Sequence, residues 1–323
     1  MARAPDRRAP RSWALCLALL AAPLSARAQD EAAAAQTTFA WPVPSAATVV
    51  ETVFKGGQES KTRYRLTMTR RDGGGIRVRY SDFEFLEVAG MDATTPAMKE
   101  RLAAATALAS AIPDLHVRAD GSFEAATGLA EIMTKVVDYL AEERGWSGEE
   151  KEGVRANMQE SGMLDSLKAA VGQYWRCWVG AWRGWTLPRG ESVTQQREVD
   201  VLGSAAEATV TLRNRGAPKD HPEALSLEMR IQASGRAFST AMATYVGDLV
   251  ERFAGDEEPA ELLPKLTFAL DETFAVITSP RTLVPLLATS ERKVTAKDRA
   301  TAEQLQEIER HRYDFTWDAT GDK

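Results

Sequence analysis

Apolar and polar side chains alternate along at least eight separate stretches of this chain. The clearest stretch runs from Leu225 to Gln232, where Leu, Leu, Met and Ile occupy every second position between polar residues. A period of two places the apolar side chains on one face of an extended strand, so each stretch is expected to be a half-buried strand. Glycine-rich turns between neighbouring stretches, such as Gly73–Gly75, predict hairpins and an antiparallel sheet with one solvated face.

Helical spacing interrupts these strands in a few places. It predicts amphipathic helices over Pro96–Ile112, from Leu129 onwards and around Phe238 and Met242. Residues 297–310 are polar and are expected to be weakly helical. Runs of strands interrupted by single helices predict an α+β fold, in which a curved, mostly antiparallel sheet is packed by several amphipathic helices.

Four of the eight tryptophans lie within eleven residues, at Trp175, Trp178, Trp182 and Trp185. Spacings of 3, 4 and 3 follow one face of a helix, and such aromatic stripes usually pack into a core. Two glycines weaken the second half of the stripe, so the helix is expected to end near Val179. We therefore predict that Trp175 and Trp178 are core anchors. Trp182 and Trp185 are the candidate ligand-binding residues, at the mouth of a site where an apolar or sugar ligand could stack.

Residues 1–28 have the pattern of a secretory signal peptide. Arginines precede an apolar run from Trp13 to Leu24, and Ala26–Ala28 form a small-x-small cleavage motif. The run is too short to span a bilayer, and no later segment is a transmembrane candidate. We therefore expect a protein that is periplasmic, or secreted, after cleavage of the signal peptide.

The remaining chain divides into two parts. Residues 29–44 are rich in alanine and are expected to form a flexible leader. Residues 45–323 are expected to form a single α+β domain, with a largely helical central segment at about 127–187. Both halves of this domain run through several strands and one helix, but no residue-level repeat supports an internal duplication.

Charge and cysteine content narrow the classes of partner. Cleavage after residue 28 would leave 35 basic and 45 acidic residues, a net charge of −10. Such a charge disfavours nucleic acid and anionic membrane surfaces as partners. Cys177 would be the single remaining cysteine, so no internal disulfide is expected and the fold must depend on its core. Between its tryptophan neighbours, Cys177 is expected to be a small buried apolar residue.

Motifs for catalysis and metal binding are weak. His116, His221 and His311 are far apart, and none has the His-x-x-x-His spacing of a zinc-binding helix. Ser290 and Lys293 have the spacing of a Ser-x-x-Lys motif, but none of its companion motifs is present. The sequence therefore predicts no catalytic residue, no metal site and no cofactor.

Three short segments, at residues 117–123, 187–193 and 313–317, resemble a type of uncharacterised exported bacterial protein, a domain of unknown function. In order, they read Val-Arg-Ala-Asp-Gly-Ser-Phe, Leu-Pro-Arg-Gly-Glu-Ser-Val and Tyr-Asp-Phe-Thr-Trp. The resemblance implies a single strand-rich extracytoplasmic domain. It implies no activity and no catalytic residue.

Three functions from different classes fit these observations. The leading hypothesis is an exported, non-enzymatic protein that binds an apolar or amphipathic small molecule, because curved sheets with helices on the concave side recur in carriers of lipids or lipoproteins. The second is an envelope structural or assembly protein that binds a protein partner through an exposed sheet edge. The third is a hydrolase whose site is assembled from residues far apart in the sequence.

Overall fold

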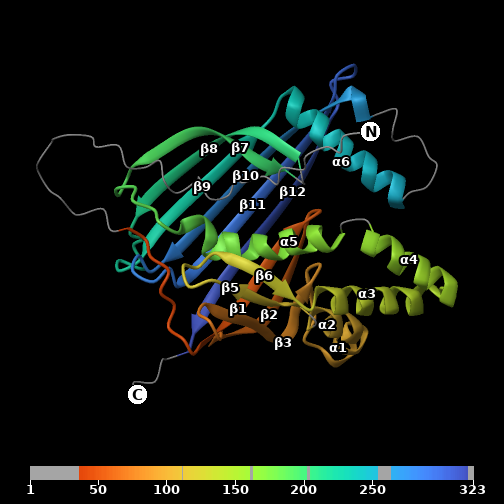
Figure 1. Cartoon of the computed structure of the whole chain (residues 1–323), viewed down its shortest axis with the longest axis horizontal. Coiled ribbons are helices and arrows are strands. Elements are labelled where there is room, and N and C mark those ends of the chain that lie inside the picture. Colours follow the sequence, from red (N-terminus) through yellow and green to blue (C-terminus); the bar gives the residue numbers. More distant parts are fainter. Residues whose placement is uncertain (1–35, 111, 161–162, 202–203, 254–262, 319–323) are drawn as a thin grey trace, which may run out of the picture.

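Twelve strands form one antiparallel sheet in the computed structural model, which describes residues 36–110, 112–160, 163–201, 204–253 and 263–318 (Figure 1). The strand order is β6-β5-β3-β2-β1-β12-β11-β10-β9-β8-β7, and the two-residue β4 pairs with β3. Pairing of β1 with β12 joins the N-terminal and C-terminal strands into one continuous sheet. The signal peptide predicted at residues 1–28 lies outside the described residues.

Most of the strands are long. Their bounds are β1 (Ser45–Lys55), β2 (Gln58–Arg70), β3 (Ile76–Val88), β4 (Met91–Asp92), β5 (Asp114–Val117), β6 (Phe123–Thr127), β7 (Ser192–Val201), β8 (Ser204–Gly216), β9 (Leu225–Ala233), β10 (Leu266–Thr278), β11 (Pro285–Asp298) and β12 (Gln304–Trp317). The helices are α1 (Pro96–Arg101), α2 (Ala103–Ala109), α3 (Leu129–Arg144), α4 (Gly148–Glu160), α5 (Met163–Trp178) and α6 (Arg236–Phe253). Two 3-10 turns, η2 (Gly180–Trp182) and η3 (Leu263–Lys265), follow α5 and precede β10.

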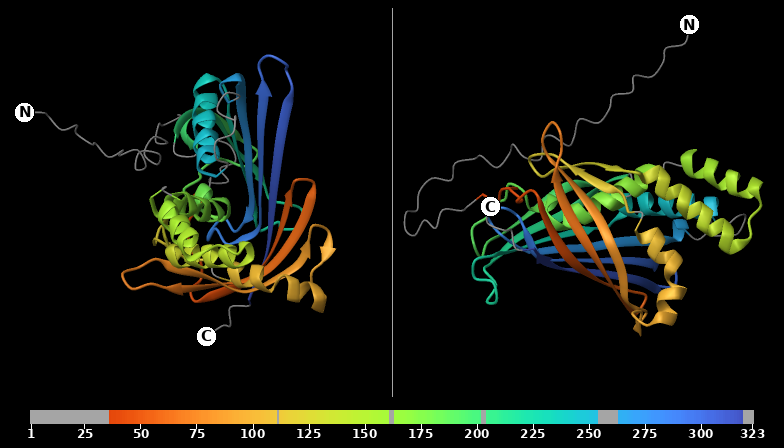
Figure 2. Two further views of the ribbon diagram at one scale, coloured as in Figure 1. Left: turned by 90° about the vertical axis from the view of Figure 1, so that its right-hand side faces the viewer. Right: turned by 90° about the horizontal axis from the view of Figure 1, so that it is seen from below.

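The sheet is strongly bent. Figure 2 shows the strands β1–β3 and the strands β9–β12 as two walls that meet at an angle, with α5 lying inside that angle. The second long helix, α6, lies along the same concave side and contacts β8 and β10. Alternation along each strand explains this arrangement, because Leu227, Met229 and Ile231 of β9 are all buried while the residues between them are not.

The predicted fold class, α+β with a sheet packed by several helices, is wrong. A single large antiparallel sheet dominates the described chain, and the helices are few. Contacts with the concave face come from α5 and α6, whereas α3 and α4 pack against each other and against α5. None of the described helices combines the length and the apolar character needed to cross a membrane.

One segment was predicted to be the wrong kind of element. Residues 297–310, predicted to be weakly helical, instead end β11 and begin β12, with Lys297 paired to Gln304. Both faces of this hairpin are polar or only partly buried, so the sequence lacks the alternation that marks a half-buried strand. The backbone ladder to the partner strand fixes the conformation here, and that pairing depends on tertiary structure.

Residues 36–44, part of the segment predicted to be a flexible leader, lack regular structure but pack against the domain through two buried side chains. The hydroxyl of Thr37 donates to the carbonyl of Trp182 at 2.5 Å, and the indole N–H of Trp41 donates to the carbonyl of Leu283 at 2.8 Å. Both side chains are buried. This segment therefore closes one end of the core beside the tryptophan stripe.

Candidate functional site

The tryptophan stripe begins on the last turns of α5 and is part of the core. Trp175 and Trp178 are fully buried, which confirms their predicted role as anchors. The Trp175 indole donates to the carbonyl of Gly121 at 2.8 Å. The Trp178 ring packs edge-on against Tyr313 and Phe315 of β12, at 5.4 Å between centroids in both cases. These contacts hold α5 on the concave face of the sheet.

Trp182 and Trp185, predicted to line an exposed mouth, are also buried, with 0% and 9% of their surface accessible. The predicted exposure is therefore wrong. Beyond α5 the chain turns back through η2, and the indole N–H groups of Trp182 and Trp185 donate to the carbonyls of Cys177 and Ala181, at 2.6 and 2.7 Å. Neither ring lines the pocket of the concave face. Their contact with a ligand stays a prediction.

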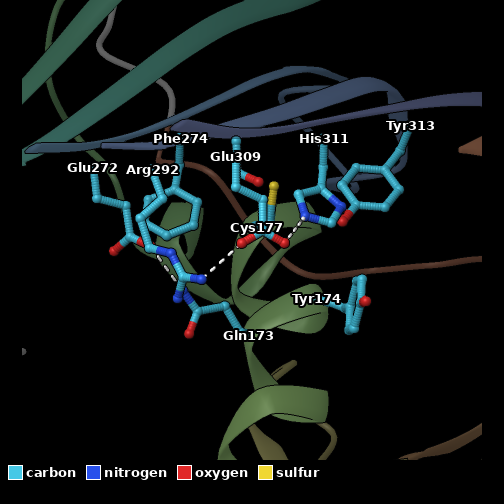
Figure 3. Close-up of a pocket in the computed structure, with 10 residues that line it drawn as sticks. Gln173, Tyr174, Cys177, Glu272, Phe274, Arg292, Glu309, His311 and Tyr313 are labelled. Carbon is cyan, nitrogen blue, oxygen red and sulfur yellow. Dashed lines mark hydrogen bonds and ion pairs between the residues drawn. The ribbon is translucent and has the colours of Figure 1, made fainter. Parts of the chain in front are cut away.

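A pocket of about 210 Å³ lies between α5 and the strands β10–β12, on the concave face (Figure 3). Figure 3 shows side chains from the helix and from the three strands converging on it. Its lining residues are Gln173, Tyr174 and Cys177 from α5, Glu272 and Phe274 from β10, Ser290 and Arg292 from β11, and Glu309, His311 and Tyr313 from β12.

Strand register brings these residues together. Glu272 pairs with Arg292, and Arg292 pairs with Glu309, so three charged side chains form one row across the sheet. Two positions further along each strand, Phe274, Ser290 and His311 form the next row. Because side chains two residues apart share a face, both rows point towards α5.

An ion cluster at β12 occupies one side of the pocket. The His311 Nδ1 lies 3.0 Å from the Glu51 carboxylate, and its Nε2 lies 3.1 Å from the Glu309 carboxylate. Arg292 donates to Glu309 at 2.7 Å. Burial lowers the pKa of His311, but hydrogen bonds to Glu51 and Glu309 outweigh it and raise the pKa above its usual range.

Two carboxylate partners favour the doubly protonated imidazolium of His311. In that form neither ring nitrogen has a lone pair. His311 is therefore unsuited, in this arrangement, to act as a general base or as a metal ligand. The described residues contain no group of three or more histidine, cysteine, aspartate or glutamate side chains that could hold a metal ion.

Glu272 is the most deeply buried charged residue of the pocket, with 8% of its surface accessible. One carboxylate oxygen accepts a hydrogen bond from the side-chain amide of Gln173 at 2.8 Å. Burial raises the pKa of Glu272, and the charges of Arg176 and Arg292 oppose that rise. The second oxygen accepts no hydrogen bond from any described side chain, so Glu272 retains capacity for a donor.

Cys177 lies at the base of the pocket but is a poor nucleophile. Its side chain is buried, and its Sγ lies 3.5 Å from the carbonyl of Thr289, to which it can donate. Burial raises the pKa of the thiol well above its usual range. Since the thiolate is the reactive form of cysteine, this environment keeps Cys177 inert. The expectation of a small, buried apolar residue is confirmed.

Aromatic rings supply the apolar wall. Tyr174 and Tyr313 pack edge-on, with centroids 6.0 Å apart. Phe274 is buried in the floor of the sheet, and the guanidinium of Arg176 lies 5.5 Å from the centre of its ring. The pocket thus combines apolar surface with a small number of oriented polar groups, as small-molecule binding sites do.

Sequence reasoning missed this pocket, although a signal for it exists. Glu272 occupies the apolar phase of β10, between Leu270 and Phe274. Glu51 occupies the apolar phase of β1 in the same way, two residues after the buried Val49. A charged residue in the buried phase of a strand must find a polar partner or a cavity, because an unpaired buried charge is costly.

Comparison with known proteins identifies no family for this chain. No protein-family model and no curated protein matches this sequence. Among solved structures, one that describes lipid–protein interactions in lipovitellin superposes with a TM-score of 0.37 and 6% sequence identity. The match covers 86% of this chain and 25% of lipovitellin, so this chain spans about a quarter of that protein. So loose a superposition identifies neither a family nor a ligand.

Proposed function

We propose that this protein is an exported, non-enzymatic binding protein that holds a small amphipathic molecule in the pocket between α5 and β10–β12. The observation that supports it most strongly is the lining of that pocket, where three aromatic rings and a buried carboxylate face one cavity of about 210 Å³. A molecule with both apolar and polar parts can use both kinds of surface. Export, and residence in the periplasm, are proposed from the pattern of residues 1–28 alone.

The volume sets a limit on what can enter. An apolar cavity of roughly 150 Å³ is large enough to hold benzene, whereas pockets for drug-sized ligands usually start at roughly 300 Å³. At about 210 Å³, the pocket fits a single ring, a short alkyl chain or one end of a longer molecule. The proposed ligand is therefore small, or inserts one end.

Binding is favoured over catalysis because the reactive side chains of the pocket are occupied or inert. Both nitrogens of His311 contact carboxylates, and the thiol of Cys177 is buried and protonated. Arg292 and Glu309 are bonded to each other. What remains is an apolar wall, the neutral hydroxyls of Tyr174, Ser290 and Tyr313, and a carboxylate with an unused oxygen, which together suit recognition.

Filling the pocket tests the proposal. Ser290→Leu adds a bulky side chain on the pocket face of β11, whereas Thr289→Leu adds a leucine to the opposite face of the same strand. The wild-type protein and both variants are purified from the periplasm and analysed by native mass spectrometry. They are then screened for thermal stabilisation by a panel of small amphipathic compounds.

We expect bound or stabilising molecules for the wild-type protein and for Thr289→Leu, and none for Ser290→Leu. Equal binding by Ser290→Leu and Thr289→Leu would place the ligand elsewhere. Absence of any ligand from the wild-type protein in both assays would contradict the proposed function.

A further inference from the structure

We infer that the polar end of the ligand is a protonated amine, which donates to Glu272 at the floor of the pocket. This inference rests on the proposed function and names the ligand class for that same pocket. It follows from which hydrogen-bonding groups of the lining are already used, which remain available, and how deeply each one lies.

The polar groups at the floor mainly accept hydrogen bonds. Glu272 accepts one bond from Gln173 and has a second oxygen without a partner among the described residues. Glu309 already accepts bonds from Arg292 and His311. A ligand that reaches this depth therefore meets carboxylates, and a donor fits there better than another acceptor.

The positively charged side chains around the pocket already interact with other protein groups or lie near its rim. Arg292 has 46% of its side chain exposed and donates to Glu309, while His311 is held between two carboxylates. Lys55, from β1, contacts Glu307 and Glu309. Arg176, from α5, lies over the Phe274 ring and does not line the pocket. A carboxylate or phosphate group would find a cationic partner at the rim, beside Arg292, whereas the hydroxyl donors of Tyr174, Ser290 and Tyr313 are neutral.

An amine gains two interactions at the floor that an alcohol cannot match. Its hydrogen bond to Glu272 is charge-assisted, and such bonds are roughly twice as strong as neutral ones. Its positive charge also interacts favourably with the faces of aromatic rings within about 6 Å. Arg176 already uses the Phe274 ring in this way, and the His311 ring stacks on Tyr313 at 6.0 Å, which leaves Tyr174 as the remaining aromatic ring of the lining. The positive charges of Arg176 and Arg292 oppose these gains, and their exposure to solvent weakens that opposition.

Three probes with one alkyl chain and different ends test the inference: n-octylamine, n-octanol and n-octanoate. Binding is measured by isothermal titration calorimetry at pH 7.5 to the wild-type protein and to Glu272→Gln, which keeps the side-chain shape and removes the charge. Glu291→Gln is the matched control, because Glu291 is a carboxylate on the opposite face of β11 that pairs with Arg310.

We expect octylamine to bind the wild-type protein at least tenfold more tightly than octanoate, with octanol between them. Glu272→Gln should weaken octylamine at least tenfold and change octanol by less than threefold, and Glu291→Gln should change neither. Glu272→Asp, which restores the charge on a shorter side chain, should recover part of the octylamine affinity.

Different results separate the two proposals. If octanoate binds as tightly as octylamine, or if Glu272→Gln weakens octylamine and octanol alike, the amine inference is wrong while the binding function stands. If none of the three probes binds the wild-type protein, the amine inference is wrong. If the wild-type protein also fails to bind any compound of the broader amphipathic panel, the proposed function fails as well.

Discussion

Replacing Trp182 with alanine should destabilise the protein strongly, although the sequence suggested an exposed ring. The side chain is fully buried, its ring lies 5.4 Å from that of Trp185, and its N–H donates to the carbonyl of Cys177 at 2.6 Å. Removing a buried tryptophan costs about 3–5 kcal/mol in the free energy of unfolding. For a domain of this size, each kcal/mol lowers the melting temperature by about 2 °C, so we expect a decrease of about 6–10 °C.

The assay is thermal unfolding followed by circular dichroism, with two comparison variants. Trp182→Phe retains most of the apolar surface and loses the N–H, so it should cost about 1–2 kcal/mol. Trp146→Ala is the control, because Trp146 lies between α3 and α4, is only half-buried, and interacts with Arg144 at 5.8 Å. That variant should lose less than about 1 kcal/mol. A Trp182→Ala protein that melts within about 2 °C of both the wild type and Trp146→Ala would refute the packing described here.

Two further predictions concern the pocket and the sheet. The pKa of His311 is raised in the folded protein, so its stabilising contribution is complete below its unfolded pKa of about 6.5 and is lost as the pH rises through the folded pKa. Urea unfolding measures how much the free energy of unfolding of His311→Gln falls below that of the wild type. This loss should be larger at pH 6 than at pH 9, by roughly 1.5 kcal/mol. An equal loss at both pH values would contradict the ion cluster. Gly75→Ala should cost about 3 kcal/mol, because Gly75 has a positive φ and an added Cβ would lie 2.2 Å from the carbonyl oxygen of Val117. Gly73 has a similar φ but open space around it, so Gly73→Ala should cost about 1–2 kcal/mol in the same urea titration. Equal losses for the two variants would exclude a close approach of β5 to Gly75.

The strands of the core could be predicted from local pattern, because alternation reports directly on which face of a strand is buried. Leu227 and Met229 are buried as the period of two requires, and Trp175 and Trp178 are buried as the helical spacing requires. These predictions depend only on neighbours in sequence. They succeed wherever one side of an element faces a core and the other faces water.

The fold class and the pocket were decided by tertiary structure. Residues 297–310 are held as a hairpin by pairing with neighbouring strands, and their composition alone suggested a weak helix. Trp182 is buried because the chain turns back after α5, which brings its indole to the carbonyl of Cys177, and because the segment around Thr37, 145 residues away in sequence, packs against it.

The pocket has the same origin. Strand register places Glu272 and His311 around one cavity, and it brings Glu51, 260 positions away in sequence, into contact with His311. The sequence by itself determines that these charged residues fall in the buried phase of their strands, which is a local property. Which partners satisfy them depends on the order of strands in the sheet, and that order is set by long-range pairing that local patterns do not encode.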